Sequence, residues 1–327
     1  MATAASSQVI LSSEFILSKY GESLAGKTIL ITGVAGDSIA GELAVQVSSA
    51  NPSTLIVTAR AESRVEPIIA KIKAKSPAVN VRFLKIDLSD LKDVRRAVQD
   101  LSDVPKIDHL VAVAGVMMPP FAKTVDGVES QFAVNYLANF LLVKELLPKI
   151  RAAAPKSSIV ICGSSAMRGG VINLDDINYN DGKDYDPRAG YGASNVARSM
   201  FAKLLAEKLQ GESIRVFSID PGAVASGLQR HFTPEFIDMI RAIRKSGEPM
   251  RDLDGRPILL PPFTGTSEGA ATLITAMIDP TIEESNGAYL HNNAVADEEL
   301  TSHVLNRDLW LKLWELSEKL IGEPFNV

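Results

Sequence analysis

A glycine-containing turn near the start of the chain carries residue types suited to binding a phosphate. Residues 27–47 read KTILITGVAGDSIAGELAVQV: a β-branched apolar run ends at Gly33, and apolar residues recur at helical spacing from Ile39. A helix that begins just after such a turn directs free N–H groups and the positive end of its dipole into it. The pattern predicts a pyrophosphate site of the kind found in dinucleotide-binding folds, with an ordinary strand–turn–helix connection as the alternative.

Charged residues follow the next two predicted strands. Arg60 comes directly after the run that ends in Thr58-Ala59, and Arg64 lies four residues further on. A cation at this place suits the 2′-phosphate of NADP(H), whereas NAD needs a carboxylate for the ribose, so the sequence favours NADP(H) over NAD. The alternative is that both arginines only solvate a helix start. Asp87 opens the run DLSD, which predicts either a helix-capping turn or a carboxylate for the adenine amino group.

The elements that must position these residues alternate between two periods. Short apolar runs predict buried strands at Thr54–Thr58, Val81–Ile86, His109–Ala114, Ser158–Cys162 and Ile214–Ile219. Helical periodicity predicts helices over Ser63–Lys75, Leu91–Leu101, Asp126–Ile150 and Ala189–Gln210. Strands that alternate with helices predict an α/β fold with a doubly wound parallel sheet, and ligands of such sheets gather beyond the carboxyl ends of the strands.

Composition excludes several classes of protein. The 327 residues are 46% apolar and 22% charged with a formal charge of −5, so neither nucleic acid nor an anionic membrane is an expected partner. The single cysteine, Cys162, excludes an internal disulfide and fits a reducing compartment, which we expect to be the cytoplasm. We expect residues 1–23 to be an N-terminal extension rather than a signal peptide, and residues 24–327 to be one domain.

Short motifs in a fixed order indicate a family. Ala114-Gly115 follows the fourth strand, FAVNY carries Asn135, GSS ends the fifth strand, and two further motifs are YGASN from Tyr191 and DPG from Asp220. Together they resemble the short-chain dehydrogenase/reductase family, which has a dinucleotide-binding, Rossmann-like fold. Within it the chain is most similar to retinol-dehydrogenase-like and fungal reductases, because INLDDIN stands between the serine and tyrosine motifs and LWLKLWELSEKLIG closes the chain.

This resemblance implies a role for each matching position. Tyr191 matches the catalytic acid/base, Ser164 the hydroxyl that holds the substrate oxygen, and Asn135 the asparagine whose helix site holds a water in the proton relay; Ser165 is the less favoured serine. The cofactor-binding residues expected from the turn and from the resemblance are Gly33, Asp37, Ser38, Ile39, Arg60, Asp87, Leu88, Ala114, Gly115, Pro221, Gly222, Val224 and Ser226. The last of these flank the nicotinamide in the family.

One departure from the family affects the tyrosine. The family has a lysine four residues after it, and this chain has Asn195. A cation within about 4–6 Å shifts a pKa by roughly 1–3 units, so its loss costs the phenolate about 1.4–4 kcal/mol. Oxidation, which needs the phenolate as base, should suffer more than reduction, and Asn195 is expected to replace the lysine only in part, as a hydrogen-bond partner of a ribose hydroxyl.

Other departures affect the cofactor loop. The family motif T-G-x-x-x-G-x-G is replaced by TGVAGDSIAG, which puts Gly36 and Gly41 out of register and leaves Asp37 or Ser38 where a glycine is usual. If Asp37 faces the pyrophosphate, the two like charges cost roughly 1–4 kcal/mol, and the cost shrinks if Asp37 or Ser38 caps the helix. The loop before Gly115 also lacks the family's two asparagines. Because of these departures, a site that binds no cofactor remains one of the alternatives.

The last third of the chain supplies the expected substrate side. Residues 223–265 contain FTPEFIDMIRAIRK and a proline-rich exit, and the apolar residues Phe232, Phe236, Ile237, Ile240 and Ile243 predict a helix face that closes over a ligand or packs on the core or a partner subunit. Ser267–Met277 predicts another helix and Gly287–Leu290 a final strand. The stripe from Leu309 to Leu320 is more typical of core or docking surface than of a cofactor site. The four histidines lack metal-ligand spacing, so no metal is expected.

These observations predict an NADP(H)-dependent carbonyl reductase for an apolar small molecule, of the kind made in secondary metabolism. One alternative is a non-redox enzyme on the same scaffold, such as a cyclase, dehydratase or isomerase. A second is a catalytically silent binding or regulatory protein. The long predicted helices Asp126–Ile150 and Ala189–Gln210 leave open a homo-oligomer, because such helices pair between subunits or cover the sheet.

Overall fold

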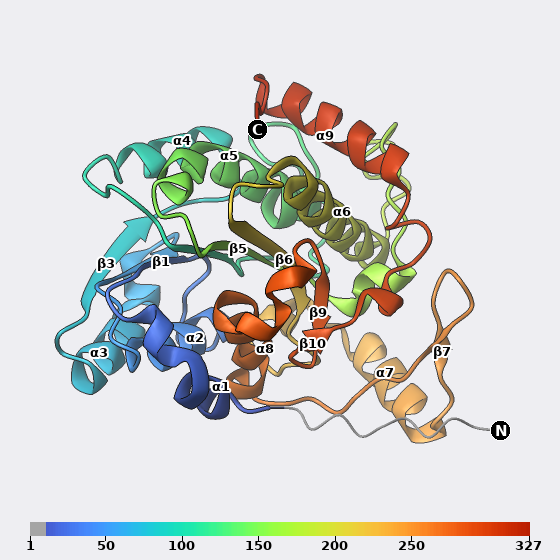
Figure 1. The fold of residues 1–327 in the computed structure, drawn as a ribbon. Helices are drawn as coiled ribbons and strands as arrows, with labels where there is room; N and C mark the ends of the chain where they lie inside the picture. The colour runs from blue at the N-terminus through green and yellow to red at the C-terminus, as the bar shows by residue number, and fades with distance from the viewer. Residues whose placement is uncertain (1–10) are drawn as a thin grey trace.

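An eight-stranded sheet runs through the middle of the molecule in the order β10–β9–β6–β5–β4–β1–β2–β3 (Figure 1). The computed structural model describes residues 11–327. The strands are β1 (Thr28–Ile31), β2 (Thr54–Ala59), β3 (Asn80–Lys85), β4 (His109–Ala112), β5 (Ser157–Cys162), β6 (Ile214–Asp220), β9 (Tyr289–His291) and β10 (Ala294–Val295). Neighbours pair in parallel except β9 and β10. The predicted doubly wound parallel sheet is confirmed.

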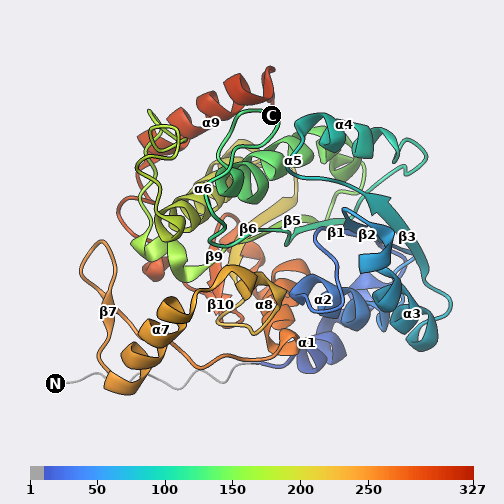
Figure 2. The ribbon, with the colours of Figure 1, turned by 180° about the vertical axis from the view of Figure 1, so that it is seen from behind.

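Helices cover both faces of this sheet (Figures 1 and 2). One face carries α4 (Leu91–Gln99), α5 (Ala138–Arg151), α6 (Pro187–Lys208) and α9 (Arg307–Ile321); the other carries α1 (Ser13–Tyr20), α2 (Ile39–Ser48), α3 (Glu66–Lys75) and α8 (Thr266–Ile278). Successive strand residues point to opposite faces, so Leu30 joins the first core while Ile29 and Ile31 join the second. Because both faces are buried, the strands read as unbroken apolar runs.

The helix expected from Asp126 begins later than predicted. Residues 124–128 form a turn in which Gly127 has a φ of +77°, and the chain becomes helical only at Ser130. The carboxylate of Glu129 accepts hydrogen bonds from the N–H groups of residues 131 and 132 at 2.8 Å, so it closes the first turn. The predicted start was wrong because apolar spacing does not reveal a left-handed glycine and a capping carboxylate.

The helix expected over Ser63–Lys75 is also divided. A 3₁₀ turn, η2 (Glu62–Arg64), precedes α3, and Pro67 stands in the first turn of α3. Proline lacks the N–H of a helix interior and favours a first turn, which accounts for the division. The later predictions are confirmed in part: α8 and β9 lie at the helix and strand expected near Ser267 and Gly287, but β9 is not the final strand because β10 follows it.

The segment over residues 223–265 lies at one side of the sheet (Figure 1). It forms η5 (Gly227–His231), α7 (Pro234–Ser246) and a two-stranded hairpin of β7 (Met250–Arg251) and β8 (Pro257–Ile258). The Thr233 hydroxyl caps α7, and Gly247 ends it in the left-handed conformation. The predicted helix is therefore present, and its role over a substrate stays a prediction.

Both ends of the described chain pack on the sheet's helices. In α9, Trp314 stacks on Phe325 with ring centroids 4.9 Å apart and meets Phe140 edge-on at 5.0 Å, so the predicted apolar stripe is core. Ile16 of α1 is buried, and α1 packs against α8. The first ten residues of the predicted N-terminal extension lie outside the described residues. From residue 11 onward, no helix is long and apolar enough to cross a membrane.

Candidate active site

The turn after β1 brings two backbone segments into close contact. Gly33 has a φ of +78°, and a Cβ built on it would lie 2.7 Å from the Cα of Ala114. The Thr32 hydroxyl accepts hydrogen bonds from the N–H groups of Val113 and Ala114, both at 3.0 Å. Glycine is required at position 33 because a side chain would strain the left-handed backbone and overlap the loop after β4.

Ser38 starts α2 and fixes the conformation of the turn. Its hydroxyl accepts hydrogen bonds from the N–H groups of Ala35 and Gly41, each at 3.0 Å, so Ser38 rather than Asp37 caps the helix. A Cβ built on Gly41 would lie 2.1 Å from the carbonyl oxygen of Ala35. Gly41, which stands out of register with the family motif, is therefore the glycine that lets the helix pack on its own turn.

The first turn of α2 fits a phosphate. The backbone N–H groups of Ile39 and Ala40 have no acceptor within residues 11–327. Gly36 in the same turn is exposed, and a Cβ there would meet nothing within 4 Å. Free N–H groups at the positive end of a helix dipole, beside a turn that glycines keep open, suit a pyrophosphate.

Asp37 faces the loop that follows β6. Its carbonyl oxygen accepts a hydrogen bond from the N–H of Gly227 at 3.2 Å, and a Cβ built on Gly227 would lie 2.2 Å from Asp37 Oδ2. Val224 and Ile39 both pack against Gly269 of α8. The structure thus brings the predicted residues 37, 39 and 224 together, and it turns the Asp37 carboxylate toward Gly227.

Asp220 holds the segment after β6 in place. Its Oδ1 accepts a hydrogen bond from the N–H of Gly222 at 2.9 Å, and its Oδ2 accepts one from the N–H of Ser165 at 2.8 Å. Gly222 has a φ of +83° and follows Pro221, and Ser226 caps η5 further along. The buried Asp220 carboxylate therefore ties the predicted nicotinamide segment to the serine loop after β5.

The charged residues after β2 and β3 lie at the same edge of the sheet as the glycine turn, because all three strands are parallel. Arg60 is exposed, and in the described part of the chain neither Arg60 nor Arg64 pairs with a carboxylate. Asp87 Oδ1 accepts hydrogen bonds from both the N–H and the hydroxyl of Ser89, at 2.9 and 2.6 Å. Asp87 thus builds its own turn through one oxygen, while Leu88 is buried in the core.

Tyr191 and Ser164 come together from the first turns of α6 and the end of β5. Burial raises the pKa of Tyr191 above its ordinary value of 10.0, and the positive charge of Arg198 and a hydrogen bond with Ser164 act against this rise. The Ser164 hydroxyl also accepts a hydrogen bond from the N–H of Ala166 at 3.2 Å. Ser165 engages Asp220 through its backbone instead, so Ser164 is the serine that meets the tyrosine.

Asn135 lies in η3 (Phe132–Leu137), a π-helical turn that leads into α5. Its side chain bonds both backbone groups of Val116, which fixes the loop after β4. Its carbonyl oxygen accepts hydrogen bonds from Arg198 Nε at 2.5 Å and from Asn139 Nδ2 at 2.8 Å. A carbonyl oxygen has two lone pairs, and protein donors engage both of them here. The relay water expected at Asn135 stays a prediction.

Asn195 does not present its amide to a ligand. It is fully buried, its Nδ2 donates to the backbone oxygen of Tyr191 at 2.9 Å, and its Oδ1 accepts a hydrogen bond from Arg198 Nη1 at 3.3 Å. The expectation that Asn195 replaces the lysine at a ribose hydroxyl is therefore corrected. Its physical reason is that the short amide satisfies both of its ends inside the protein.

Arg198 is a residue of this site that the sequence analysis missed. It is 3% exposed, and besides its bonds to residues 135 and 195 its Nη2 donates to the carbonyl oxygen of Ala114 at 2.6 Å. A Cβ built on Gly115 would lie 3.1 Å from the same Nη2, so Gly115 leaves room for the guanidinium. The sequence does contain an indication of it: Arg198 stands among small and apolar residues of a predicted helix. Because arginine is rarely buried unless its charge is compensated, an arginine in such a stretch indicates a specific interaction.

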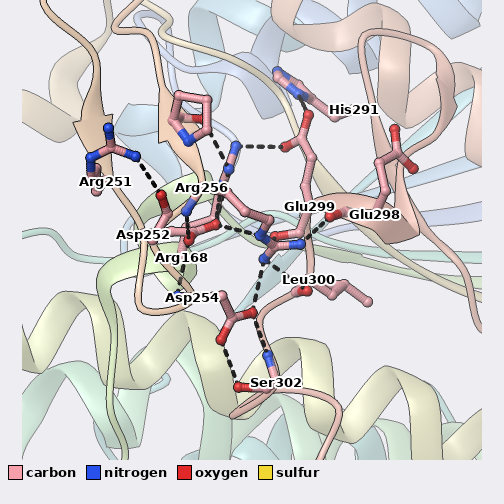
Figure 3. Close-up of polar contacts among 12 residues, drawn as sticks. Arg168, Arg251, Asp252, Asp254, Arg256, His291, Glu298, Glu299, Leu300 and Ser302 are labelled. Carbon is pink, nitrogen blue, oxygen red and sulfur yellow. Dashed lines mark hydrogen bonds and ion pairs between the residues drawn. The ribbon is translucent and has the colours of Figure 1, made fainter.

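A cluster of charged side chains ties the β7–β8 hairpin to the loop that carries Ser164 (Figure 3). Asp252 Oδ2 pairs with Arg168 Nη2 at 3.0 Å and with Arg256 Nε at 2.9 Å, and the Asp252 side chain is fully buried. Arg168 belongs to η4 (Ser165–Gly169), directly after Ser164. The cluster therefore fixes the hairpin beside the candidate active site.

His291 joins this cluster through Glu299 (Figure 3). Its Nδ1 lies 2.9 Å from Glu299 Oε1, and Glu299 Oε2 lies 3.9 Å from Arg168 Nη1. Burial alone would lower the pKa of His291, but the hydrogen bond to Glu299 and the negative charges of Asp220 and Glu299 raise it overall. Sequence reasoning missed the cluster because its members come from segments far apart in the chain.

The apolar face of α7 is half-buried. No α7 residue is fully buried, and Phe232 meets Phe236 edge-on with ring centroids 4.7 Å apart. Arg244 lies 4.5 Å from the ring centroid of Phe263 and donates to the carbonyl oxygen of Pro261. The helix thus packs on the proline-rich exit of its own segment rather than in the core of the sheet.

The other potentially reactive side chains, Cys162 and His109, are buried in the core. Burial raises the pKa of the Cys162 thiol to about 12 and lowers that of His109 to about 3. His109 Nδ1 lies 2.8 Å from the Ser158 hydroxyl, inside the sheet. Among the residues described, no group of three or more histidine, cysteine, aspartate or glutamate side chains is placed to hold a metal ion.

The chain is similar in sequence to known proteins. Residues 27–235 match the family model described as short chain dehydrogenase. The chain is 30% identical to retinol dehydrogenase 14 of Homo sapiens over 311 residues, which cover 91% of this chain and 87% of that protein. It is 31% identical to polyprenol dehydrogenase of Mus musculus over 274 residues, which cover 82% and 76%.

Solved structures share the fold. A protein of Mycobacterium paratuberculosis matches with a TM-score of 0.70 at 24% identity, covering 93% of this chain and 96% of that one. The NADP complex of RhlG from Pseudomonas aeruginosa matches with a TM-score of 0.60 at 24% identity, covering 82% and 95%. Because the family model spans more than half of the chain, the chain belongs to the short-chain dehydrogenase family of oxidoreductases, with retinol dehydrogenases among its relatives.

Proposed function

We propose that the chain is an NADP(H)-dependent carbonyl reductase or alcohol dehydrogenase that acts on an apolar small molecule. The observation that carries the proposal is the meeting of Tyr191 and Ser164 at the carboxyl ends of the parallel strands. The glycine turn after β1 opens at the same edge of the sheet. A proton donor and a nucleotide-binding turn therefore share one edge, as reduction of a carbonyl by a nicotinamide requires.

The residues of this edge fit a dinucleotide. Gly33 and the N–H groups of Ile39 and Ala40 would hold the pyrophosphate, and the segment Pro221–Ser226 would flank the nicotinamide. Arg60, exposed and without a carboxylate partner in residues 11–327, supports NADP(H) over NAD because a guanidinium binds a 2′-phosphate. When bound, the nicotinamide supplies or accepts the hydride.

The chain's own groups handle the oxygen and its proton. The Ser164 hydroxyl donates a hydrogen bond to the substrate oxygen and so stabilises the charge that develops there. The Tyr191 phenol donates its proton to that oxygen in reduction and takes it back in oxidation. Burial, which raises the pKa of Tyr191, keeps the phenol protonated at neutral pH and therefore favours reduction.

The apolar substrate class draws support from two sides. Relatives of the chain are named for retinol and for polyprenol, both of which are long apolar alcohols. The half-buried face of α7 with Phe236, together with Phe232 just before the helix, offers an apolar surface in the segment whose hairpin is fixed next to Ser164. The buried, protonated thiol of Cys162 is consistent with a reducing compartment such as the cytoplasm.

The test combines nucleotide binding with turnover. Calorimetric titration should show micromolar binding of NADPH and weaker binding of NADH. Oxidation of NADPH, followed by absorbance, should occur with retinal or a prenyl aldehyde. In Tyr191→Phe the rate should fall by roughly 10²- to 10⁴-fold with NADPH binding unchanged. Ser164→Ala should also lose activity, whereas its matched control Ser165→Ala should keep most of the activity.

The same experiment separates the alternatives. Failure of both nucleotides to bind would reject the reductase and favour a cofactor-free pocket. Nucleotide binding without oxidation of NADPH, together with Tyr191-dependent conversion of a substrate, would indicate the non-redox enzyme. Ligand binding with no turnover, unaffected by Tyr191→Phe, would indicate a regulatory protein.

A further inference from the structure

Arg198 brings a positive charge into the interior of the candidate active site. It is 3% exposed, and no carboxylate within residues 11–327 pairs with it. A guanidinium does not lose its proton in a protein, so the charge is permanent. A buried charge without a counter-ion is strongly unfavourable, which makes its presence here informative.

The geometry of α6 explains how Arg198 reaches this place. Tyr191, Asn195 and Arg198 stand at positions i, i+4 and i+7, so they share one face of the helix. Side chains on a helix lean toward its N-terminus, and arginine is long enough to reach back by one turn. The 3.3 Å bond from Arg198 Nη1 to Asn195 Oδ1 shows that it does so.

Three acceptors from three segments hold the guanidinium. They are the carbonyl oxygen of Asn135 in the π-helical turn, the carbonyl oxygen of Ala114 after β4, and Asn195 Oδ1 on α6. These bonds use three of the five N–H groups of Arg198, and the other two have no acceptor among the described residues. The group is thus fixed in position with donors to spare.

The charges around Tyr191 single out Arg198. From β5, Cys162 is among the groups that act on the pKa of Tyr191, but its thiol stays protonated because burial raises its own pKa to about 12. From β6, the carboxylate of Asp220 acts to raise the pKa of Tyr191, and Ser164 lowers it by hydrogen bonding. Arg198 is the cation that favours the phenolate among the groups that act on Tyr191.

We propose that Arg198 substitutes for the lysine that the family has at the position of Asn195. It is a positioning residue that keeps a positive charge beside Tyr191 and donates a hydrogen bond to the carbonyl oxygen of Asn135. The inference rests on the proposed function, since it explains how Tyr191 works without the lysine. It also explains why Asn195 is tolerated, because its amide serves as an acceptor for Arg198.

The test measures the ionisation of position 191 directly, without nucleotide or substrate. Tyr191 is replaced by difluorotyrosine, whose phenol ionises nearer to neutral pH, and its titration is followed by ¹⁹F NMR. Arg198→Gln keeps a hydrogen-bond donor but removes the charge, whereas Arg198→Lys keeps the charge with fewer donors. We expect Arg198→Gln to raise the pKa at position 191 by about one unit or more, and Arg198→Lys to stay within a few tenths of the parent.

Kinetics in the unlabelled protein provide a second readout. The pH at which alcohol oxidation reaches half of its maximal kcat should move upward in Arg198→Gln by the same amount, and Asn195→Lys in that background should reverse the shift. Asn195→Lys alone should not raise kcat, because a cation is already present and the new ammonium would replace the acceptor that lies 3.3 Å from Arg198 Nη1. This last variant keeps the proposal testable if Arg198→Gln fails to fold.

Several results would overturn the inference. An unchanged titration in a folded Arg198→Gln protein, or equal titrations in the Gln and Lys variants, would show that the charge does not act on Tyr191. A tenfold gain in kcat from Asn195→Lys alone would show that the cation was missing. Because the NMR titration needs no turnover, its failure is distinguishable from failure of the reductase proposal.

Discussion

Replacing Gly41 by alanine tests the packing of the cofactor turn. The added Cβ would lie 2.1 Å from the Ala35 carbonyl oxygen, and ordinary contact begins at 3.4 Å, so the turn or α2 must move by more than 1 Å. Alanine gains about 1 kcal/mol over glycine in a helix, but forcing atoms into a packed site costs about 1–3 kcal/mol. Because the obstacle is backbone, we expect the upper end of that range and a net loss of about 2 kcal/mol.

Thermal unfolding followed by circular dichroism measures this loss. For a protein of this size we expect Tm to fall by about 3 °C, and NADPH to bind at least tenfold more weakly because the N–H groups of α2 are displaced. Gly36→Ala is the matched control for stability: its Cβ meets nothing within 4 Å, so we expect a gain of about 0.4–1 kcal/mol. A Gly41→Ala protein as stable as the parent would refute the reasoning.

Two further predictions concern charged residues at the edges of the site. Arg60→Ala should weaken NADPH binding about tenfold while leaving NADH binding and Tm nearly unchanged, because the side chain is exposed; equal losses for both nucleotides in calorimetry would contradict this. Because the folded-state pKa of His291 is raised, its charged pair with Glu299 is complete below pH 6.5 and is lost as the pH rises through the raised pKa. His291→Gln keeps a hydrogen bond without the charge. At pH 6 the variant should therefore be less stable than the parent by about 1 kcal/mol, with a lower Tm, and this difference should vanish at high pH. A difference in Tm that does not depend on pH would reject the charged pair.

Part of the site was predictable because it depends on short stretches of sequence. Gly33 and the helix from Ile39 follow from local apolar spacing and a single glycine, and the structure places them as expected. Tyr191 and Ser164 were assigned through the resemblance to the family, and the structure brings them together. The glycine turn and the helix start are set by a few neighbouring residues, and each family motif is a short run of sequence.

The remaining features depend on contacts that apolar spacing does not reveal, some between neighbouring residues and some between distant segments. The helix predicted from Asp126 starts at Ser130 because a turn and the Glu129 carboxylate end the preceding loop. The carbonyl oxygen of Asn135 binds Arg198, which is 63 residues away in sequence. Apolar periodicity carries no information about either contact.

The sequence by itself determined the order of strands and helices, the glycine turn and the positions of the acid/base candidates, because propensity, periodicity and motif spacing are local properties. Only the tertiary structure decided how the charges are arranged. Folding places the Arg198 guanidinium among carbonyls from three segments and turns the Asn195 amide inward. Desolvation and electrostatic attraction depend on distances through space, and those distances exist only once the sheet has brought its loops together.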